Sequence, residues 1–353
     1  MKAHYCSRCG QRIFFENVAC TNCGAALGYV PGEGMVSFDV AGGQWTRAGS
    51  AGAAQRPCAN YVDHAVCNWM VACEDPSTLC RSCRLTRMIP ALVAPGNLQR
   101  WGVIEQAKRR LIHALIDNDL PVVSKSEDDR GLAFDLLEDT PSTPHVVTGH
   151  DSGVITLNIA EADDAVREKT RNAMHEPYRT LLGHLRHESG HYYWERLVSG
   201  TPLQDGFRSL FGDERVDYAT ALTTHYASPR LDWQNEFVSA YASSHPWEDW
   251  AETWAHYWHI ADGLETAAAW GLRLNGVARD ADPVTPAAIV RGGEDIAASI
   301  VQQWLPVSQF VNAMDRSLGT RDSYPFVLNE RVVEKLQFVH RVCRTTTNAA
   351  DAR

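Results

Sequence analysis

Two histidines four residues apart, with a glutamate after the first, are the residues of this sequence best suited to catalysis. They are His187, Glu188 and His191, in the stretch HESGH. Helix positions four apart lie one above the other, so both imidazoles can bind one Zn²⁺ at about 2.0–2.1 Å. Glu188 lies one position further round, which suits a base that takes a proton from a zinc-bound water. The pattern predicts a zinc-dependent hydrolase.

The two histidines need a helix, and the surrounding residues have helical spacing. Apolar side chains recur at Tyr178, Leu181, Leu182, Leu185, Trp194, Leu197 and Val198. We therefore expect a helix over residues 178–198 with both histidines near its middle. The alternative is two surface histidines that bind no metal.

A catalytic zinc needs a third protein ligand and one open position for water. The pattern HExxHxxGxxH is excluded, because Trp194 and Leu197 stand where its glycine and third histidine would be. A second predicted helix, for which Pro246 suits the first turn, carries Glu248 and Glu252 four residues apart. We assign Glu248 as the third ligand and Glu252 as a carboxylate that braces a metal-bound histidine.

Two alternatives for this assignment remain open. Glu248 and Asp249 could simply stabilise a helix N-terminus, by about 0.3–1 kcal/mol each. Asp213, Glu214 and Asp217 form another acidic group, which is closer in sequence to the histidines and is also expected to be helical. Among these, Glu214 is the second choice for the third ligand.

Hydrolysis also needs a donor for the negative charge that develops on the carbonyl oxygen, typically Tyr, His or Arg. Tyr241 lies seven residues before Glu248, two turns away if one helix carried both. Pro246 argues against a continuous helix. His245 and His256 are the alternative donors.

Four cysteines near the start form two Cys-x-x-Cys pairs, Cys6 with Cys9 and Cys20 with Cys23. Each pair lets two thiolates approach one ion from a tight turn, and two such turns complete a tetrahedral zinc site. A disulfide is the alternative, but clustered cysteines of a reducing compartment favour a metal. The pattern predicts a zinc ribbon with a structural zinc.

A second cysteine group consists of Cys58, Cys67, Cys73, Cys80 and Cys83. Cys80 and Cys83 form a Cys-x-x-Cys pair, so two further ligands must come from the other three. We choose Cys58 and Cys67, because carboxylates directly after Cys73 would not favour a thiolate. Buried apolar cysteines without a metal are the alternative. The group predicts a second structural zinc.

The cysteines divide the chain, since nine of the ten precede residue 84. We expect a double zinc-ribbon domain at residues 1–90 and a hydrolase domain at residues 97–345. The second domain should start with a helix over residues 97–118.

Short β-like runs follow at residues 132–137, 145–148 and 154–159, and the chain after residue 160 has a helical pattern. A cysteine-rich module followed by a mostly helical domain with a small β-sheet is an α+β fold.

Composition excludes some classes of function. The net charge of −10 disfavours binding to nucleic acid or to an anionic membrane, because phosphate contacts need a basic face. The first ten residues are polar and lack the apolar stretch of a signal peptide. There is also no apolar run long enough to cross a bilayer. We therefore expect a cytoplasmic protein without a membrane partner.

The catalytic residues resemble those of a known group. HExxH followed downstream by Glu-x-x-x-Glu is similar to the gluzincin branch of zinc metallopeptidases, in which the first of these glutamates is the third ligand. Lethal-factor-like members have a tyrosine seven residues before it. The resemblance implies a ligand role for Glu248 and a catalytic role for Tyr241.

The whole chain resembles the bacterial zinc-binding metallopeptidase family with an N-terminal zinc ribbon. The cysteine pattern ending at Cys83, the HESGH motif and the stretch HPWEDWAETW at residues 245–254 carry this resemblance, which covers nearly all of the chain. The family pattern has no cysteine at the place of Cys73, which favours Cys58 and Cys67 as ligands. The resemblance implies a zincin-like fold for the second domain.

The expected function is hydrolysis of a peptide or protein substrate by a zinc-activated water, with Glu188 as the general base. One catalytic and two structural zinc ions are expected. The strand at residues 154–159 could offer an edge on which an extended peptide pairs. Two alternatives are an adaptor whose ribbons bind a protein or a nucleic acid, and a metal-dependent amidase for a small molecule. The ribbons of a peptidase could also bind a protein partner.

Overall fold

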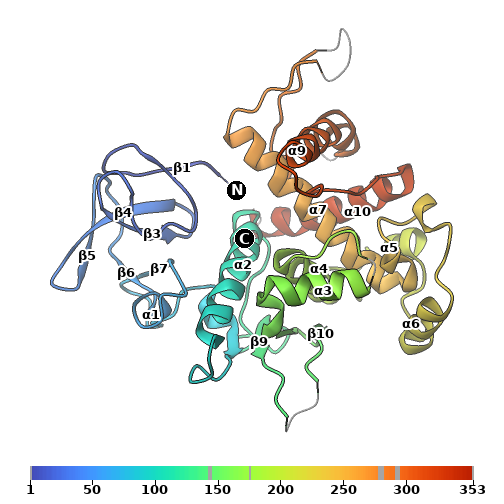
Figure 1. The fold of residues 1–353 in the computed structure, drawn as a ribbon, viewed down its shortest axis with the longest axis horizontal. Helices are drawn as coiled ribbons and strands as arrows, with labels where there is room; N and C mark the ends of the chain where they lie inside the picture. Colours follow the sequence, from blue (N-terminus) through green and yellow to red (C-terminus); the bar gives the residue numbers. More distant parts are fainter. Residues whose placement is uncertain (1, 142–144, 175, 277–281, 291–294, 352–353) are drawn as a thin grey trace. The chain divides into compact units, whose positions relative to one another are not determined.

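The computed structural model describes residues 2–141, 145–174, 176–276, 282–290 and 295–351 (Figure 1). The chain packs as two compact units. The first comprises Met1–Asp117 and Pro121–Lys169, and the second comprises Asn118–Leu120 and Thr170–Arg353. The predicted α+β class is confirmed, because a cysteine-rich region of strands precedes a mostly helical region with a small sheet.

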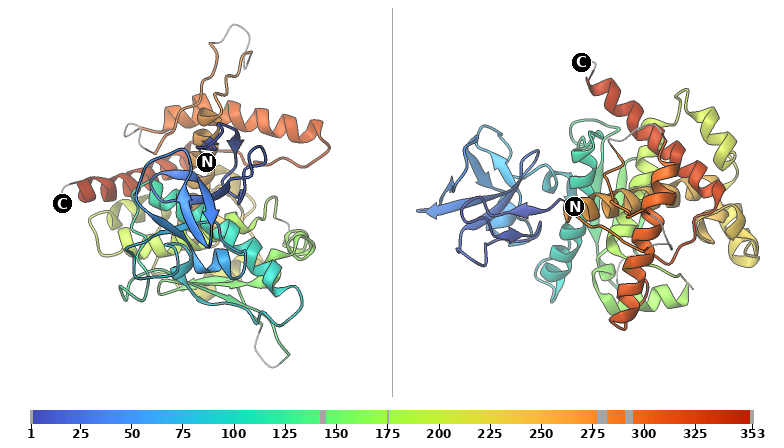
Figure 2. Two further views of the ribbon diagram at one scale, coloured as in Figure 1. Left: turned by 90° about the vertical axis from the view of Figure 1, so that its left-hand side faces the viewer. Right: turned by 90° about the horizontal axis from the view of Figure 1, so that it is seen from above.

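Short antiparallel strands build the cysteine-rich region. The strands are β1 (His4–Tyr5), β2 (Arg12–Ile13), β3 (Ala26–Val30), β4 (Gly34–Ala41), β5 (Gln44–Arg47), β6 (Gln55–Pro57) and β7 (Met70–Ala72). β1 pairs with β2, β6 pairs with β7, and β3, β4 and β5 form the three-stranded sheet drawn in blue in Figure 2. Helix α1 (Ala59–Val62) and the 3-10 turn η1 (Cys83–Leu85) complete the region. Val36 and Phe38 of β4 pack against Met70 in its core.

Helix α2 (Asn97–Asp117) follows, close to the predicted range, and most of its residues are buried. One side faces the cysteine-rich region. His113 Nδ1 and the Tyr29 hydroxyl are 2.8 Å apart, and the His113 ring lies 5.1 Å from the Phe15 ring. Buried Arg109 donates a hydrogen bond to the Val66 carbonyl oxygen. The first helix of the predicted second domain therefore shares a core with the ribbons. The division at residues 1–90 and 97–345 stays a prediction.

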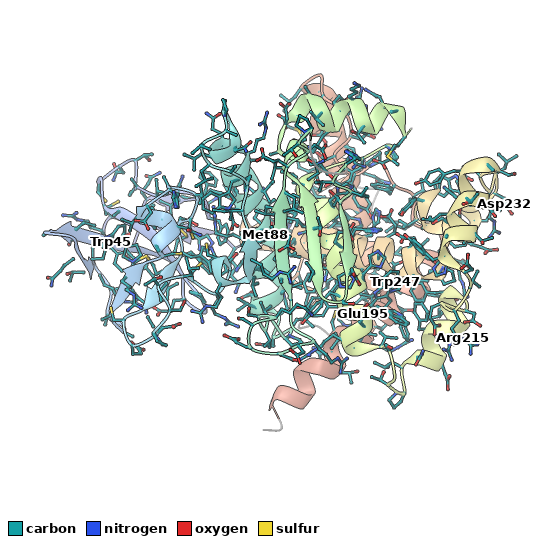
Figure 3. The ribbon with its side chains drawn as sticks, turned by 90° about the horizontal axis from the view of Figure 1, so that it is seen from below. Trp45, Met88, Glu195, Arg215, Asp232 and Trp247 are labelled. Carbon is teal, nitrogen blue, oxygen red and sulfur yellow. The ribbon has the colours of Figure 1, made fainter. Side chains whose placement is uncertain are left out.

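A four-stranded mixed sheet completes the first unit. Its strands are β8 (Thr86–Met88), β9 (Ala133–Leu137), β10 (Gly149–Asp151) and β11 (Val154–Asn158). Their order is β10-β11-β9-β8, with β9 parallel to both of its neighbours and β10 antiparallel to β11. Figure 3 shows this sheet with Met88 on β8 at one edge.

Two of the three predicted strands are present, and the run at residues 145–148 is not a strand. Its backbone bonds to a side chain instead, because the Val146 N–H donates to Asp139 Oδ1 at 2.6 Å. The strand lies at β10, where Ser152 and Gly153 turn the chain with φ of 49° and 84°. The expectation that residues 154–159 offer a free edge is wrong, since β11 lies between β9 and β10.

The remaining chain is mostly helical. The helices are α3 (Asp164–Ala173), α4 (Leu181–Leu197), α5 (Gln204–Phe211), α6 (Tyr218–Ala227), α7 (Pro246–Ala269), α8 (Ala297–Ser299), α9 (Leu305–Ser317) and α10 (Glu330–Asp351). Shorter helical turns are η2 (Ile159–Ala162), η3 (Trp233–Asn235), η4 (Tyr241–Ser244) and the π-helical η5 (Ile300–Trp304). Within the second unit, α4, α5 and α10 pack against α7 (Figure 1). In the described part of the chain, no helix is long and apolar enough to span a membrane.

A chain that begins at residue 91 should not fold as the full-length protein does. It would lose β8, which pairs with β9, and the aromatic side chains that cover His113. We expect no cooperative thermal transition of the first unit and increased binding of the dye ANS. Circular dichroism melting against the full-length protein measures this, and an unchanged cooperative transition would contradict the shared core.

Candidate metal centre

Helix α4 carries both motif histidines near its middle. It begins at Leu181 rather than at residue 178, because the Thr180 hydroxyl caps it by accepting a hydrogen bond from the Gly183 N–H at 3.0 Å. The rings of His187 and His191 are 4.9 Å apart, and both side chains are buried. The two imidazoles therefore lie side by side on one face of α4, where both can bind the same ion.

Helix α7 passes α4 at unusually close range beside these histidines. A Cβ atom added to Gly190 would lie 3.0 Å from Ala251 Cα and 3.1 Å from Trp254 Cβ. The indole N–H of Trp250 donates to the Gly190 carbonyl oxygen at 2.8 Å, and that of Trp254 donates to Ser189 Oγ at 3.2 Å. The two residues between Glu188 and His191 in the motif are therefore used to dock α7.

The first turn of α7 is fixed by Pro246 and by His245, which is its N-cap. His245 Nδ1 accepts a hydrogen bond from the Trp247 N–H at 3.0 Å, and its Nε2 donates to the Val216 carbonyl oxygen at 3.0 Å. Both ring nitrogens of His245 are thus engaged in holding the helix. The other alternative oxyanion donor, His256, is buried with its Nδ1 2.8 Å from the Tyr324 hydroxyl, and burial lowers its pKa to about 4.

His187, His191 and Glu248 converge, with one ligand atom of each within 4.8 Å of the others. His187 Nε2 is 3.0 Å from Glu248 Oε2, and His191 Nε2 is 3.6 Å from Glu248 Oε1. Tetrahedral bonds of about 2.0–2.1 Å would separate zinc ligands by about 3.3 Å. Among the described residues, none donates a hydrogen bond of good geometry to the buried Oε2. The donor set fits a zinc ion.

Glu252 lies where a brace for His187 is expected. Its Oε1 is 2.8 Å from His187 Nδ1, and its Oε2 accepts a hydrogen bond from the Ser239 hydroxyl at 2.7 Å. The Ser239 oxygen also accepts from the Ala242 N–H at 3.0 Å. A carboxylate on Nδ1 keeps that nitrogen protonated and leaves Nε2 free to bind a metal.

The electrostatics of the cluster favour a cation. Burial opposes the charging of His187, but the carboxylates of Glu248 and Glu252 raise its pKa well above the usual value. Burial likewise opposes ionisation of Glu248, yet the neighbouring histidine side chains hold its pKa well below the usual value. The buried carboxylates of Glu248 and Glu252 therefore stay ionised, which favours the binding of a cation.

The two predicted catalytic residues both lie next to this cluster. Glu188 follows His187 on α4 and is buried. Tyr241 belongs to η4, which is separate from α7, and its ring lies 6.0 Å from the His187 ring. Burial and the nearby Glu248 raise the pKa of Tyr241 strongly, so its hydroxyl keeps the proton. Their catalytic roles stay predictions.

The rival carboxylates lie outside the cluster. Asp213 and Glu214 do not lie on a helix as expected, because Gly212, with φ of 106°, ends α5. Glu214 accepts a hydrogen bond from Arg208 Nε at 3.0 Å. Asp217 is the N-cap of α6. These side chains have structural partners instead of the histidines.

Asp249, the other acidic residue of the helix-capping alternative, pairs with a residue of α10, and the N-cap of α7 is His245. Asp249 Oδ2 and Lys335 Nζ form a buried ion pair at 2.6 Å. Burial raises the pKa of Asp249 to about 7 and lowers that of Lys335, while their mutual attraction opposes both shifts. This pair ties α10 to the start of α7.

Two aromatic residues at the cluster were not predicted. The Tyr218 hydroxyl donates to Glu248 Oε1 at 2.7 Å, and the Trp247 ring lies 4.0 Å from the His191 ring. Trp247 precedes the proposed ligand, so its proximity could have been expected. Tyr218 is one of eleven tyrosines and lies 30 residues before Glu248, so no local pattern marks it.

The first ribbon has the dimensions of a tetrahedral thiolate site. Cys6 Sγ is 3.7 Å from Cys23 Sγ, and Cys9 Sγ is 3.7 Å from Cys20 Sγ. Zinc–sulfur bonds of about 2.3 Å place tetrahedral sulfurs about 3.8 Å apart. A disulfide would need about 2.05 Å. The spacing therefore fits a metal rather than a disulfide.

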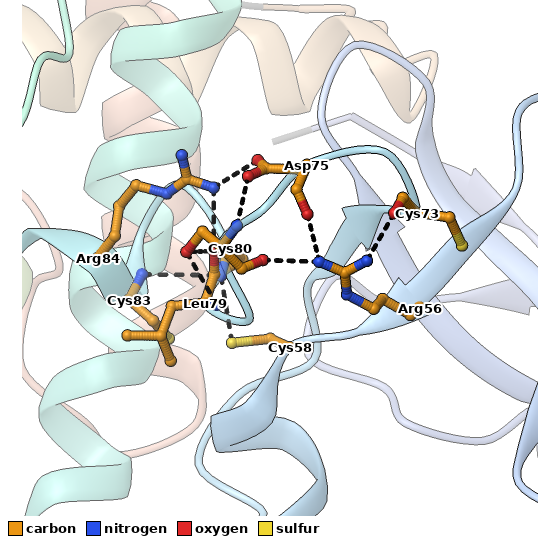
Figure 4. Close-up of polar contacts among 9 residues, drawn as sticks. Arg56, Cys58, Cys73, Asp75, Leu79, Cys80, Cys83 and Arg84 are labelled. Atoms are coloured by element: carbon orange, nitrogen blue, oxygen red, sulfur yellow. Dashed lines mark hydrogen bonds and ion pairs between the residues drawn. The ribbon is translucent and has the colours of Figure 1, made fainter.

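The second ribbon brings together the thiols of Cys58, Cys67, Cys80 and Cys83. Cys67 Sγ and Cys80 Sγ are 3.8 Å apart, again a tetrahedral spacing. Cys73 is exposed and lies outside this group. In Figure 4 its sulfur points away from Cys58, and Arg56 holds its carbonyl oxygen at 2.8 Å. The geometry favours the ligand set without Cys73.

Residues 97–342 match the family model described as "Putative zinc-binding metallo-peptidase", and residues 3–94 match that of a zinc-ribbon domain. The chain belongs to this zinc-binding metallopeptidase family. The resemblance of the whole chain to this family with an N-terminal zinc ribbon, inferred from the sequence, is thereby confirmed.

Relatives of this metallopeptidase-family chain occur in mycobacteria. One uncharacterized protein of Mycobacterium bovis and one from each of two strains of Mycobacterium tuberculosis are 44% identical to it over 345 residues. The alignments cover 97% of this chain and 95% of each relative. No solved structure matches the chain.

The zinc content should be about three ions per chain and fall to about two in His187→Ala, since the two cysteine sites are closed and independent. Elemental analysis of the purified proteins measures this. His184→Ala, on the same helix but outside the cluster, should keep all three. An unchanged count in His187→Ala would mean that the helix holds no metal.

Gly190→Ala should weaken both the fold and the third zinc site. The added Cβ meets backbone of α7, and overpacking of this kind costs about 1–3 kcal/mol. Gly102→Ala is the matched control, because its Cβ would find an ordinary contact at 3.5 Å and gain about 0.5–1 kcal/mol of helix propensity. Urea unfolding measures the stability of both variants, and elemental analysis measures their zinc content. A Gly190→Ala protein as stable as Gly102→Ala would show that α7 can move without loss.

Proposed function

We propose that this chain is a zinc-dependent peptidase whose catalytic zinc is held by His187, His191 and Glu248. The observation that carries the proposal is that these three buried side chains converge, while the Glu252 carboxylate contacts His187 Nδ1. Three protein ligands leave a fourth position for water, as catalytic rather than structural zinc sites do. A zinc ion bound there would lower the pKa of that water to about 7 and polarise the substrate carbonyl.

Glu188 is placed to move the proton. It neighbours a proposed ligand in sequence but lies one position further round the helix, so it can face the water instead of the metal. In the proposed reaction its carboxylate accepts a proton as the water oxygen bonds to the scissile carbon. It then gives this proton to the amide nitrogen as the carbon–nitrogen bond breaks.

Tyr241 is placed to donate a hydrogen bond to the carbonyl oxygen as its charge develops. Such donation needs a neutral hydroxyl, and burial together with Glu248 keeps the pKa of Tyr241 high. Its position 6.0 Å from the His187 ring, centre to centre, puts it within reach of a substrate at the proposed metal. A donor prearranged in a dry site contributes more than it would in water.

The two ribbons are proposed to hold structural zinc. An adaptor that used only the ribbons would not account for the buried cluster on α4 and α7. A small-molecule amidase would use the same cluster, so the substrate decides between amidase and peptidase.

Glu188→Gln should keep about three zinc ions per chain and lose about 10²–10⁴-fold in kcat, because glutamine cannot accept the proton. Cleavage of a library of fluorescence-quenched peptides measures kcat, and elemental analysis of the same proteins measures the zinc content. Glu195→Gln makes the same change two turns along α4 and should keep its activity. Full activity of Glu188→Gln would remove the proposed base. Cleavage of small amides alone by the wild type would favour the amidase.

A further inference from the structure

Tyr218 touches the proposed metal centre, although neither the motif nor the proposed mechanism gives it a role. It is the first residue of α6, a helix whose residues all keep part of their surface exposed. Its hydroxyl donates a hydrogen bond of 2.7 Å to Glu248 Oε1. A side chain that is 39% exposed thus reaches a carboxylate that is only 1% exposed.

This hydrogen bond distinguishes the two oxygens of Glu248. Oε1 accepts from Tyr218, whereas Oε2 lies 3.0 Å from His187 Nε2 and has no other partner among the described side chains. A carboxylate that binds a metal through one oxygen can rotate unless the other is held. The Tyr218 hydroxyl holds Oε1 and so directs Oε2 towards His187.

The position of Tyr218 is itself well supported. Its ring packs against the His245 ring at 5.2 Å and the Trp247 ring at 6.2 Å. His245 Nε2 donates to the carbonyl oxygen of Val216, two residues before Tyr218. The start of α6 is therefore fixed to the start of α7, where Glu248 lies.

We propose that Tyr218 is a positioning residue that holds Glu248 in its metal-binding orientation, as Glu252 does for His187. The proposal rests on the proposed zinc site. Removing a group that orients a ligand typically lowers metal affinity by about 10–100-fold.

The test compares Tyr218→Phe with Tyr226→Phe. Tyr226 lies on the same helix, is 59% exposed and undergoes the same chemical change. Each protein, loaded with zinc, is dialysed against a series of chelator concentrations, and the loss of the third zinc is followed by elemental analysis. Tyr218→Phe should release it about 10–100-fold more readily than wild type, whereas Tyr226→Phe should match wild type.

A melting experiment separates positioning from a general effect on folding. Because zinc stabilises the folded state that binds it, weaker binding reduces the gain in Tm on adding zinc. Tyr218→Phe should show a smaller gain but the wild-type Tm after the third zinc is removed. The proposal would be overturned if Tyr218→Phe retained zinc as well as wild type does. It would also be overturned if the Tm of Tyr218→Phe lay below that of wild type by the same amount with and without zinc.

Glu248→Ala identifies which idea has failed. If Glu248→Ala loses the third zinc while Tyr218→Phe holds it as tightly as wild type, only the role of Tyr218 is wrong. If Glu248→Ala also keeps the third zinc, the proposed zinc site itself is wrong, and the role of Tyr218 is wrong with it.

Discussion

The close approach of α4 and α7 at Gly190 is the constraint on which the metal centre depends. Two of the converging groups come from α4 and the third comes from α7, so the gap between the helices sets the distance from His187 Nε2 to Glu248 Oε2. A glycine lets the Cα of Ala251 come as near as it does. Buried tryptophans of α7 then hold this approach through hydrogen bonds to the backbone and side chain of α4.

Around this contact, each converging group has its own support. Glu252 orients His187, and Ser239 in turn orients Glu252. Trp247 lies against His191, and Tyr218 bonds to Glu248. The supports come from several separate segments of the second unit, including α6 and the residues before η4. A site arranged in this way is preformed, because its side chains have little freedom to lose when an ion binds.

The features that could be predicted well from the sequence are those formed by residues close together in the chain. Spacing of four within HESGH and Cys-x-x-Cys pairs specify geometry directly, because neighbouring residues on one turn or helix must lie together. Glu248 could be chosen because a proline and a second carboxylate mark its helix. The link from Tyr218 to Glu248 spans 30 residues and depends on how α6 lies against α7, for which the sequence has no periodic signal.

The strands and the helix α2 show a second limit of sequence patterns. Residues 145–148 have strand composition, yet the Asp139 carboxylate competes for their backbone, and this competition is not visible in a period of two. Helix α2 lies close to its predicted range, but the sequence does not show that the side with Arg109 and His113 would also be covered. Burial on two sides depends on tertiary packing that neither pattern encodes.

The covered side of α2 has a consequence for how chains of this kind can be recombined. A zinc ribbon is often treated as an independent module that can be exchanged at the linker that follows it. Here the linker before Asn97 separates Tyr29 and Phe15 from the His113 that they contact. A chimera joined at that linker would combine two halves of different cores, whereas one joined after Asp117 would carry the matched surfaces together.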